Sequence, residues 1–136
     1  MFKLSKKTEY GILALRYISS LNGQEVATVR EIAEKYKIPQ SLLAKILQQL
    51  VRGEMIKSVQ GSRGGYVMHK DSSRISLADV VEAIEGPIHL IGCGEKEDDC
   101  VRHDICDLKG TFAPVQEQIV EFFRSVTLDN FDIVER

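Results

Sequence analysis

The feature that most constrains the fold is a series of three short helical segments followed directly by a glycine-rich hairpin. Ser5 can cap the first helix, and Thr28 and Glu31 have the spacing of a capping box for the second. Pro39 suits the first turn of the third helix, because a backbone N–H has no helical partner at that position. These signals predict three consecutive helices, each with its own start.

A short hairpin follows the third helix. Segments 55–59 and 66–69 are expected to be strands, and the glycines in the turn between them suit the positive φ angles of a tight turn. Three helices followed by such a hairpin form the winged helix-turn-helix pattern, in which the second helix of the pair enters the major groove of DNA. We therefore predict a mainly α fold with a small β-hairpin, in which residues 1–74 form a winged helix-turn-helix DNA-binding domain.

The third helix carries most of the candidate DNA-binding residues. Its apolar positions are expected to face the core, which leaves a polar face outward, and the hairpin tip adds an arginine. Glutamine can read adenine edges, lysine can contact guanine or phosphate, and an arginine on a wing can enter the minor groove. A solvated helix surface would explain the lysine and glutamines by itself, but the hairpin that follows favours contact with DNA. The candidates are Gln40, Ser41, Ala44, Lys45, Gln48 and Arg63.

The distribution of charge agrees with a polyanionic partner for the first half of the chain. Residues 1–74 contain 13 Lys and Arg against 6 Asp and Glu, whereas residues 75–136 contain 5 against 14. This asymmetry predicts a basic face that binds double-stranded DNA and an acidic remainder.

Composition and motifs argue against several other classes of protein. The chain has 43% hydrophobic and 28% charged residues, as in an ordinary soluble domain, and no apolar stretch reaches the ~18 residues of a membrane span. The N-terminus lacks the apolar stretch of a signal peptide, so we expect a cytoplasmic protein without a membrane partner. The sequence has no Ser-His-Asp set, no His-Glu-x-x-His motif and no nucleotide-binding loop, so we do not expect an enzyme.

All three cysteines lie in one acidic stretch, 88–110, that has neither a helical nor a strand period. Six residues separate Cys93 from Cys100, and five separate Cys100 from Cys106. An odd number of crowded cysteines argues against a disulfide framework, and the spacing differs from the CxxC pairs of common zinc sites. Thiolates are soft ligands that suit iron–sulfur clusters, so we predict a 2Fe–2S or 4Fe–4S cluster here. Three free, buried cysteines are the alternative, which the surrounding carboxylates disfavour.

Two further helices are expected in residues 75–136. Ser76 can cap one of them, and the other runs over about 114–126. Its apolar stripe includes Phe122 and Phe123, which the chain has little of its own surface to cover, so we expect a homodimer. A two-fold dimer matches a palindromic operator with half-sites about 34–36 Å apart. Residues 75–136 are therefore predicted to form a cluster-binding loop and a long C-terminal dimerisation helix.

Taken in order, these motifs resemble those of the IscR/NsrR family of winged-helix regulators. The matching segments are 3–11, 38–50, 59–66 and the three-cysteine loop, so the resemblance covers nearly the whole chain. It implies a homodimeric transcriptional regulator, a repressor or an activator, that senses cluster status, nitric oxide, redox state or iron supply. A regulator of the same fold that responds to thiol oxidation or to a protein partner, without a cluster, is the alternative.

The resemblance implies a fourth ligand but leaves its identity open. One branch of the family uses a His three residues after the last cysteine, where this chain has Lys109. The other branch uses a first-helix carboxylate that reaches across the dimer, and the matching residue here is Glu9. The first cysteine gap is one residue longer than the commonest family spacing, so His103 remains a second candidate. The predicted ligands are Cys93, Cys100, Cys106 and Glu9.

Overall fold

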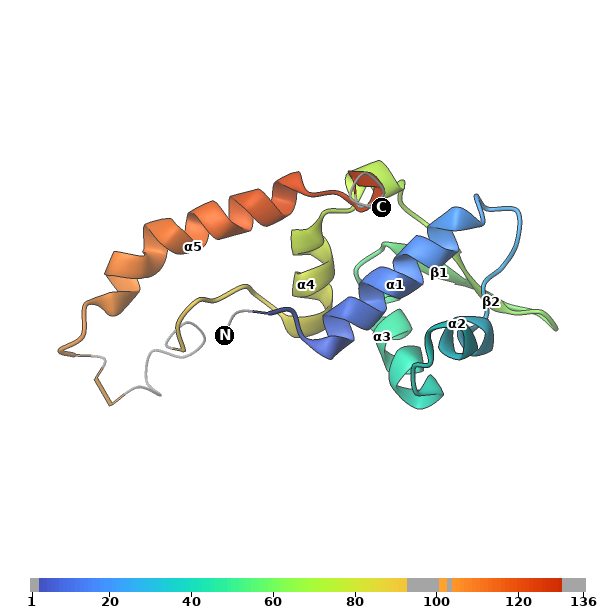
Figure 1. The fold of residues 1–136 in the computed structure, drawn as a ribbon, viewed down its shortest axis with the longest axis horizontal. Coiled ribbons are helices and arrows are strands. Elements are labelled where there is room, and N and C mark those ends of the chain that lie inside the picture. Colours follow the sequence, from blue (N-terminus) through green and yellow to red (C-terminus); the bar gives the residue numbers. More distant parts are fainter. Residues whose placement is uncertain (1–2, 93–100, 103, 131–136) are drawn as a thin grey trace.

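The computed structural model describes residues 3–92, 101–102 and 104–130 of the chain. Figure 1 shows most of the helices gathered around a two-stranded hairpin at one end, while the last long helix extends away from them. In chain order the elements are α1 (Lys6–Ser20), α2 (Val29–Tyr36), α3 (Gln40–Arg52), β1 (Ile56–Val59), β2 (Gly65–Met68), the 3-10 turn η1 (Ser72–Arg74), α4 (Leu77–Glu85) and α5 (Leu108–Ser125). This order confirms the predicted mainly α fold with a winged helix-turn-helix and a small hairpin.

Capping side chains set the starts of three helices, as the sequence predicts. Ser5 Oγ accepts a hydrogen bond from a backbone N–H in the first turn of α1 at 3.2 Å. Thr28 at α2 and Ser76 at α4 each accept from the backbone N–H three residues on, both at 3.1 Å. In return, the Glu31 and Asp79 carboxylates accept hydrogen bonds from the backbone N–H groups of Thr28 and Ser76, at 3.0 and 2.9 Å. A side-chain cap is worth about 1 kcal/mol, so local sequence alone favours these starts.

The core lies between α1, α3, α4 and the hairpin. Every apolar position of α3 that should face the core is buried, and α4 adds Val80 and Ile84 to the same cluster. Full burial of one such side chain stabilises the fold by about 1.5–3 kcal/mol, so the orientation of α3 is strongly fixed. The largest fully buried side chains are Leu15, Ile18, Ile32, Leu43, Ile46, Leu47, Leu50, Met55, Ile56, Ile75, Val80 and Thr8.

The hairpin begins and ends one residue away from the predicted limits, and its glycines serve two purposes. Gly61 has a φ of +131°, as expected for a turn glycine. Gly65 has an ordinary φ, but a Cβ there would lie 2.3 Å from the carbonyl oxygen of Ala27. Ala27 forms a two-bond bridge with Tyr66, at 3.0 and 2.8 Å. At Gly65 the expectation of a positive φ is therefore wrong, and the close approach of the chain before α2 explains the glycine.

The last helix begins earlier than the sequence predicts. The sequence predicts a start near Pro114, but α5 starts at Leu108 and the proline lies inside it. Both the backbone N–H and the hydroxyl of Thr111 bond to the Asp107 carbonyl at 3.1 Å, which closes a helical turn before the proline. Proline removes one N–H donor from a helix interior, and water can bond the carbonyl left free because this part of α5 is exposed. The helix therefore tolerates the proline.

The C-terminal end of α5 is fixed against α4. The Leu77 N–H donates to the Val126 carbonyl, and the Leu128 N–H donates to the Ile75 carbonyl, both at 2.8 Å. Leu128 itself is buried in the core. In sequence, the segment with the cysteines connects the C-terminal end of α4 to the N-terminal end of α5. The hydrogen bonds above join the opposite ends of these two helices. In the described part of the chain, no helix is long and apolar enough to cross a membrane.

Candidate nucleic-acid interface and cysteine segment

The outward side of α3 holds five of the six predicted DNA-binding residues. Four are exposed, and the fifth, Ala44, is half-buried. The turn before α3 is tight: Lys37 has a φ of +56°, and the Ile38 N–H donates to the Ala33 carbonyl at 3.0 Å. This turn presents the N-terminal residues of α3 to solvent. The exposed residues are Gln40, Ser41, Lys45 and Gln48.

The sixth predicted residue, Arg63, lies on the hairpin. The strand register pairs Ile56 with Met68 and Val59 with Gly65, so Arg63 is in the turn beyond the last pair. Its side chain is exposed. Figure 1 shows the hairpin projecting past the helices, at the end of the molecule opposite α5. The helix face and Arg63 therefore reach solvent from separate elements, as in a helix and its wing.

A groove beside α3 contains basic residues that sequence reasoning did not single out. It has a volume of about 260 Å³ and lies between α1 and α3. Lys7 and Arg52 line it together with Lys45. The excess of basic residues in the first half of the chain was the available signal, but charge counts do not say which residues meet in space.

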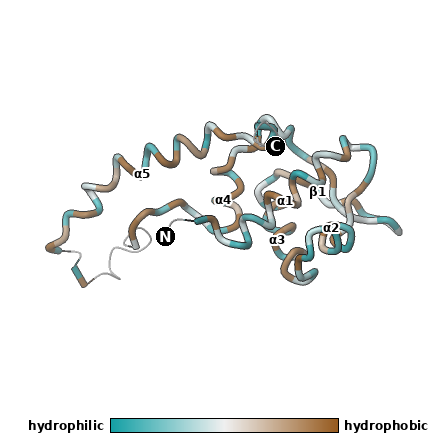
Figure 2. Tube along the Cα trace, viewed as in Figure 1, coloured by the Kyte–Doolittle hydropathy of each residue, from teal (hydrophilic) through white to brown (hydrophobic). Residues whose placement is uncertain are grey.

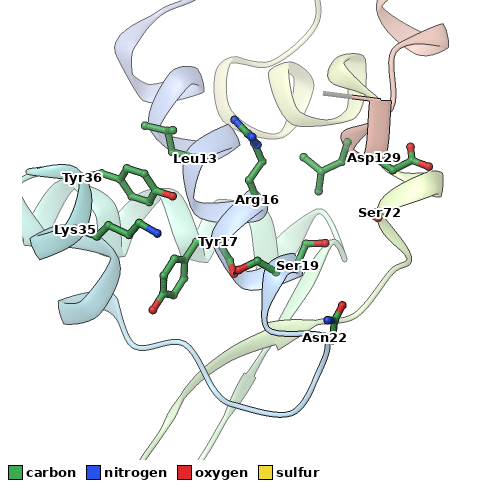
Figure 3. A pocket seen from close by; sticks show the side chains of 11 residues that line it. Leu13, Arg16, Tyr17, Ser19, Asn22, Lys35, Tyr36, Ser72 and Asp129 are labelled. Atoms are coloured by element: carbon green, nitrogen blue, oxygen red, sulfur yellow. The ribbon is translucent and has the colours of Figure 1, made fainter. Parts of the chain in front are cut away.

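A polar brace holds α2 against α1. The Tyr17 hydroxyl donates to Glu31 Oε2 at 2.7 Å, and Lys35 Nζ lies 5.1 Å from the ring centroid of Tyr17 and 5.4 Å from that of Tyr36. Figure 3 shows Tyr17, Lys35 and Tyr36 beside a cavity of about 540 Å³. The hydrogen bond from Tyr17, with a second from the Thr28 backbone, lowers the pKa of Glu31. The same bond raises the pKa of Tyr17. The brace fixes the first helix of the helix-turn-helix.

Only part of the predicted ligand set lies in the described residues. Cys106 is an exposed free thiol just before α5. Cys93, Cys100 and the alternative ligand His103 lie outside the described residues. Within the ranges that the structure describes, no three His, Cys, Asp or Glu side chains gather into a metal site.

The predicted carboxylate ligand, Glu9, is on the first turn of α1. Its side chain is 47% exposed and lies 3.7 Å from Lys6 Nζ, a surface ion pair that contributes little stability. A negative charge in the first turn of a helix also interacts favourably with the positive end of the helix dipole. Glu9 therefore has an ordinary role in stabilising α1 as well. The exposed thiol of Cys106 and the exposed carboxylate of Glu9 have the soft and hard donor chemistry that an iron site accepts.

A hydrogen bond links the start of α1 to the end of α4. The Ser5 hydroxyl donates to the Glu85 carboxylate. Glu85 is the last residue of α4, and Gly86 follows with a φ of +92°. The hydrogen bond therefore connects α1, the helix that carries Glu9, to the end of α4, after which the chain continues to the segment with the cysteines.

A polar face on the second helix of a helix-turn-helix, beside a projecting hairpin with an exposed arginine, defines a winged-helix DNA-binding protein. The chain belongs to the Rrf2 family, described as iron-dependent transcriptional regulators, whose model matches residues 4–134. Membership makes the protein a transcriptional regulator and not an enzyme, as predicted.

Two relatives are identical to this chain at about a third of the aligned positions. One is protein aau3 of Rhizobium meliloti (strain 1021), 32% identical over 129 residues, 94% of this chain and 83% of the relative. The other is the HTH-type transcriptional regulator NsrR of Oceanobacillus iheyensis, 30% identical over 122 residues, 89% of this chain and 81% of the relative.

Solved structures share the fold. CymR, the global cysteine regulator of Bacillus subtilis, superimposes with a TM-score of 0.74 at 24% identity and covers 96% of both chains. IscR of T. potens superimposes with a TM-score of 0.71 at 23% identity, over 96% of this chain and 85% of that one. At such identity the likeness concerns the winged-helix architecture alone.

Proposed function

We propose that this protein is a homodimeric regulator that senses an iron–sulfur cluster and represses or activates transcription from a palindromic operator. The observation that carries the proposal is the location of all three cysteines between α4 and α5, in a chain whose family is described as iron-dependent. The ligands would be Cys93, Cys100, Cys106 and Glu9 of the partner subunit. Free thiolates need a reducing compartment, which favours the cytoplasm.

The choice of ligands has a chemical consequence. A bound 2Fe–2S or 4Fe–4S cluster supplies iron that can react with small molecules. Carboxylate is a harder and more labile iron ligand than thiolate, so Glu9 would leave one position easily displaced. Because Glu9 belongs to the helix-turn-helix part and the thiolates to the segment before α5, ligation would connect the two parts of the dimer.

The described contacts offer a physical route from the cysteine segment to α3. The Ser5–Glu85 hydrogen bond joins the start of α1 to the end of α4. One residue earlier on α4, the Ile84 carbonyl accepts a hydrogen bond from Gln49 Nε2 of α3 at 3.3 Å. A shift of the end of α4 would therefore act on α1 and α3 together. Such a shift would change the population of DNA-binding dimers.

DNA would be read by α3 and the hairpin. The exposed Gln40, Ser41, Lys45 and Gln48, with Ala44 between them, would meet base edges in the major groove. Arg63 at the hairpin tip would enter the adjacent minor groove. Two such heads in a two-fold dimer fit half-sites about 34–36 Å apart.

A second candidate is a regulator that responds to thiol oxidation or to a protein partner without a cluster. It is favoured by the likeness of fold to a global cysteine regulator and by the exposed thiol of Cys106. An exposed cysteine is open to oxidants.

Anaerobic purification, with absorption and Mössbauer spectroscopy, separates the two candidates. A cluster gives coloured protein with iron and sulfide, and Ala at Cys93, Cys100 or Cys106 removes most of the visible absorption. We expect Glu9→Ala to shorten the cluster lifetime in air and to alter the spectrum, whereas His103→Ala leaves both unchanged. Colourless protein that loses DNA affinity on mild oxidation would support the second candidate. The reverse pattern for Glu9→Ala and His103→Ala would exclude the ligand from the partner subunit.

A further inference from the structure

The groove between α1 and α3 concentrates positive charge next to the predicted DNA-reading face. It has a volume of about 260 Å³ and is lined by Lys7 of α1 and by Lys45 and Arg52 of α3. Lys45 and Arg52 are seven residues apart, so they lie on the same side of α3 and about 10 Å apart along its axis. The remaining lining residues are Leu42, Ile46, Gln48 and Gln49.

Among the described residues, no acid neutralises these three cations. Within the described ranges, no carboxylate lies at ion-pair distance from any of them. Elsewhere on the surface such pairs do form, for example between Arg124 and Glu82 at 2.7 Å. The positive charge of the groove therefore remains available to a ligand.

The stability of the single chain does not explain why a lysine stands at position 7. It lies in the first turn of α1, where the positive end of the helix dipole disfavours a cation by roughly 0.3–1 kcal/mol. Arg52 lies in the last turn of α3, where a cation is favoured, so helix stability alone could account for it. Because only Lys7 is unfavourable for its own helix, it is the stronger evidence for a ligand in the groove.

The place of the groove on α3 identifies the kind of anion. An α-helix with its side chains is about 10–12 Å across, which nearly fills a major groove about 12 Å wide. The flanks of an inserted helix therefore meet the phosphates that line the groove. Gln48, one of the predicted base-reading residues, also lines this cavity, so a duplex read by α3 would bring one strand past it.

We propose that Lys7, Lys45 and Arg52 form a binding site for the sugar-phosphate backbone of double-stranded DNA. The inference rests on the proposed DNA-binding function and adds Lys7 and Arg52 to the residues that contact the duplex. Phosphate contacts fix the position of a protein on DNA and carry no sequence information. The site therefore contributes equally to specific and to non-specific binding.

The test is a salt titration of binding to a short fluorescent duplex of mixed sequence, for the full chain and for Lys7→Ala and Arg52→Ala. Arg74→Ala is the matched control: it removes one exposed charge from η1, on the opposite side of the winged-helix part from α3 in Figure 1. Removal of one cation that binds a phosphate should make the slope of log affinity against log salt shallower by about 0.9. Between about 50 and about 200 mM salt, the affinity of such a variant should therefore fall about 3.5-fold less than that of the wild type.

The affinities and salt slopes of the three variants test whether the groove binds the DNA backbone. We expect weaker binding and a shallower slope for Lys7→Ala and Arg52→Ala, and wild-type behaviour for Arg74→Ala. Lys7→Ala should be at least as thermally stable as the wild type, because it removes a cation from a helix N-terminus, so its loss of affinity is not a loss of fold. Wild-type slopes for both variants would overturn the inference and leave the groove to a partner other than DNA. Absence of any DNA binding by the wild-type protein would overturn the proposed function as well.

Discussion

At the scale of single residues, Glu31 is the acid on which the position of α2 most depends. Its carboxylate completes the capping box with Thr28 and accepts the hydroxyl of Tyr17 at 2.7 Å. We predict that Glu31→Ala lowers the free energy of unfolding by about 1–2 kcal/mol, measured by urea unfolding at fixed protein concentration. Glu34→Ala, which removes only an exposed ion pair with Arg30, should cost at most about 0.5 kcal/mol. Equal losses in the two variants would contradict this assignment.

The same residue gives a prediction for pH. The pKa of Glu31 lies below its ordinary value of 4.5 because Tyr17 and the Thr28 backbone donate hydrogen bonds to the carboxylate. A carboxyl whose pKa is lowered by folding stabilises the fold above its unfolded pKa, and this contribution disappears as pH falls through the folded pKa. The stability difference between wild type and Glu31→Ala should therefore be full near neutral pH and shrink below about pH 4.5. A difference that stays constant in acid would argue against the bond from Tyr17.

Roles that depend on spacing along the chain could be predicted from the sequence, and roles that depend on distant contacts could not. The caps at Ser5, Thr28 and Ser76 need only residues three positions apart. By contrast, a glycine is needed at position 65 because the chain before α2 passes too close for a Cβ atom. The groove that Lys7 lines is formed by side chains of both α1 and α3. The cysteines were recognisable from their crowding in one acidic stretch, whereas Glu9 as a ligand across a dimer came only from the family resemblance and stays a prediction.

At the scale of elements, α3 and the hairpin should contribute differently to recognition. We predict that Lys45→Ala and Gln48→Ala each weaken binding to the operator by about 1–3 kcal/mol, and that Gln48→Ala relaxes specificity at one position. Arg63→Ala should weaken binding most on operators with a narrow, A·T-rich minor groove beside the half-site. Gln24→Ala, an exposed glutamine in the loop before α2, is the control.

Competition binding with operator and mutated duplexes measures these effects. Lys45 also lines the basic groove, so its variant should lose affinity for mixed-sequence DNA too, whereas Gln48→Ala should lose mainly specific affinity. Unchanged operator affinity in all three variants would leave the predicted reading face without support.

The element boundaries show where local signals mislead. A proline often occupies the first turn of a helix, so the sequence predicts a start of α5 near Pro114. In the structure the helix continues back to Leu108, and its first turns are exposed. Because none of the side chains in these first turns is buried, no apolar pattern in the sequence marks the earlier start.

At the scale of the whole molecule, α5 is the element that the single chain leaves uncovered. Among its residues none is buried, and Figure 2 shows apolar segments recurring along its length. Phe112, Val115 and Phe122 are 37%, 43% and 64% exposed. They lie on one side of the helix, because their spacings of three and seven residues follow the helical repeat. A phenylalanine buries about 150–250 Å² when covered, so this stripe provides a strong drive for association.

We predict that the wild-type protein sediments as a dimer and that Phe122→Glu sediments as a monomer at the same concentration. The introduced carboxylate would be buried in the apolar contact, once from each subunit, and the cost of burying an unpaired charge opposes the dimer. Ala113→Glu is the matched control, because it adds the same charge to an exposed position on the other side of α5. Far-UV circular dichroism should show the same helix content in all three proteins.

The monomer should also lose most of its affinity for an operator with two half-sites, since each DNA-binding head then binds alone. A dimeric Phe122→Glu protein would place the interface elsewhere, and the partner subunit's Glu9 would then need another route to the cysteines.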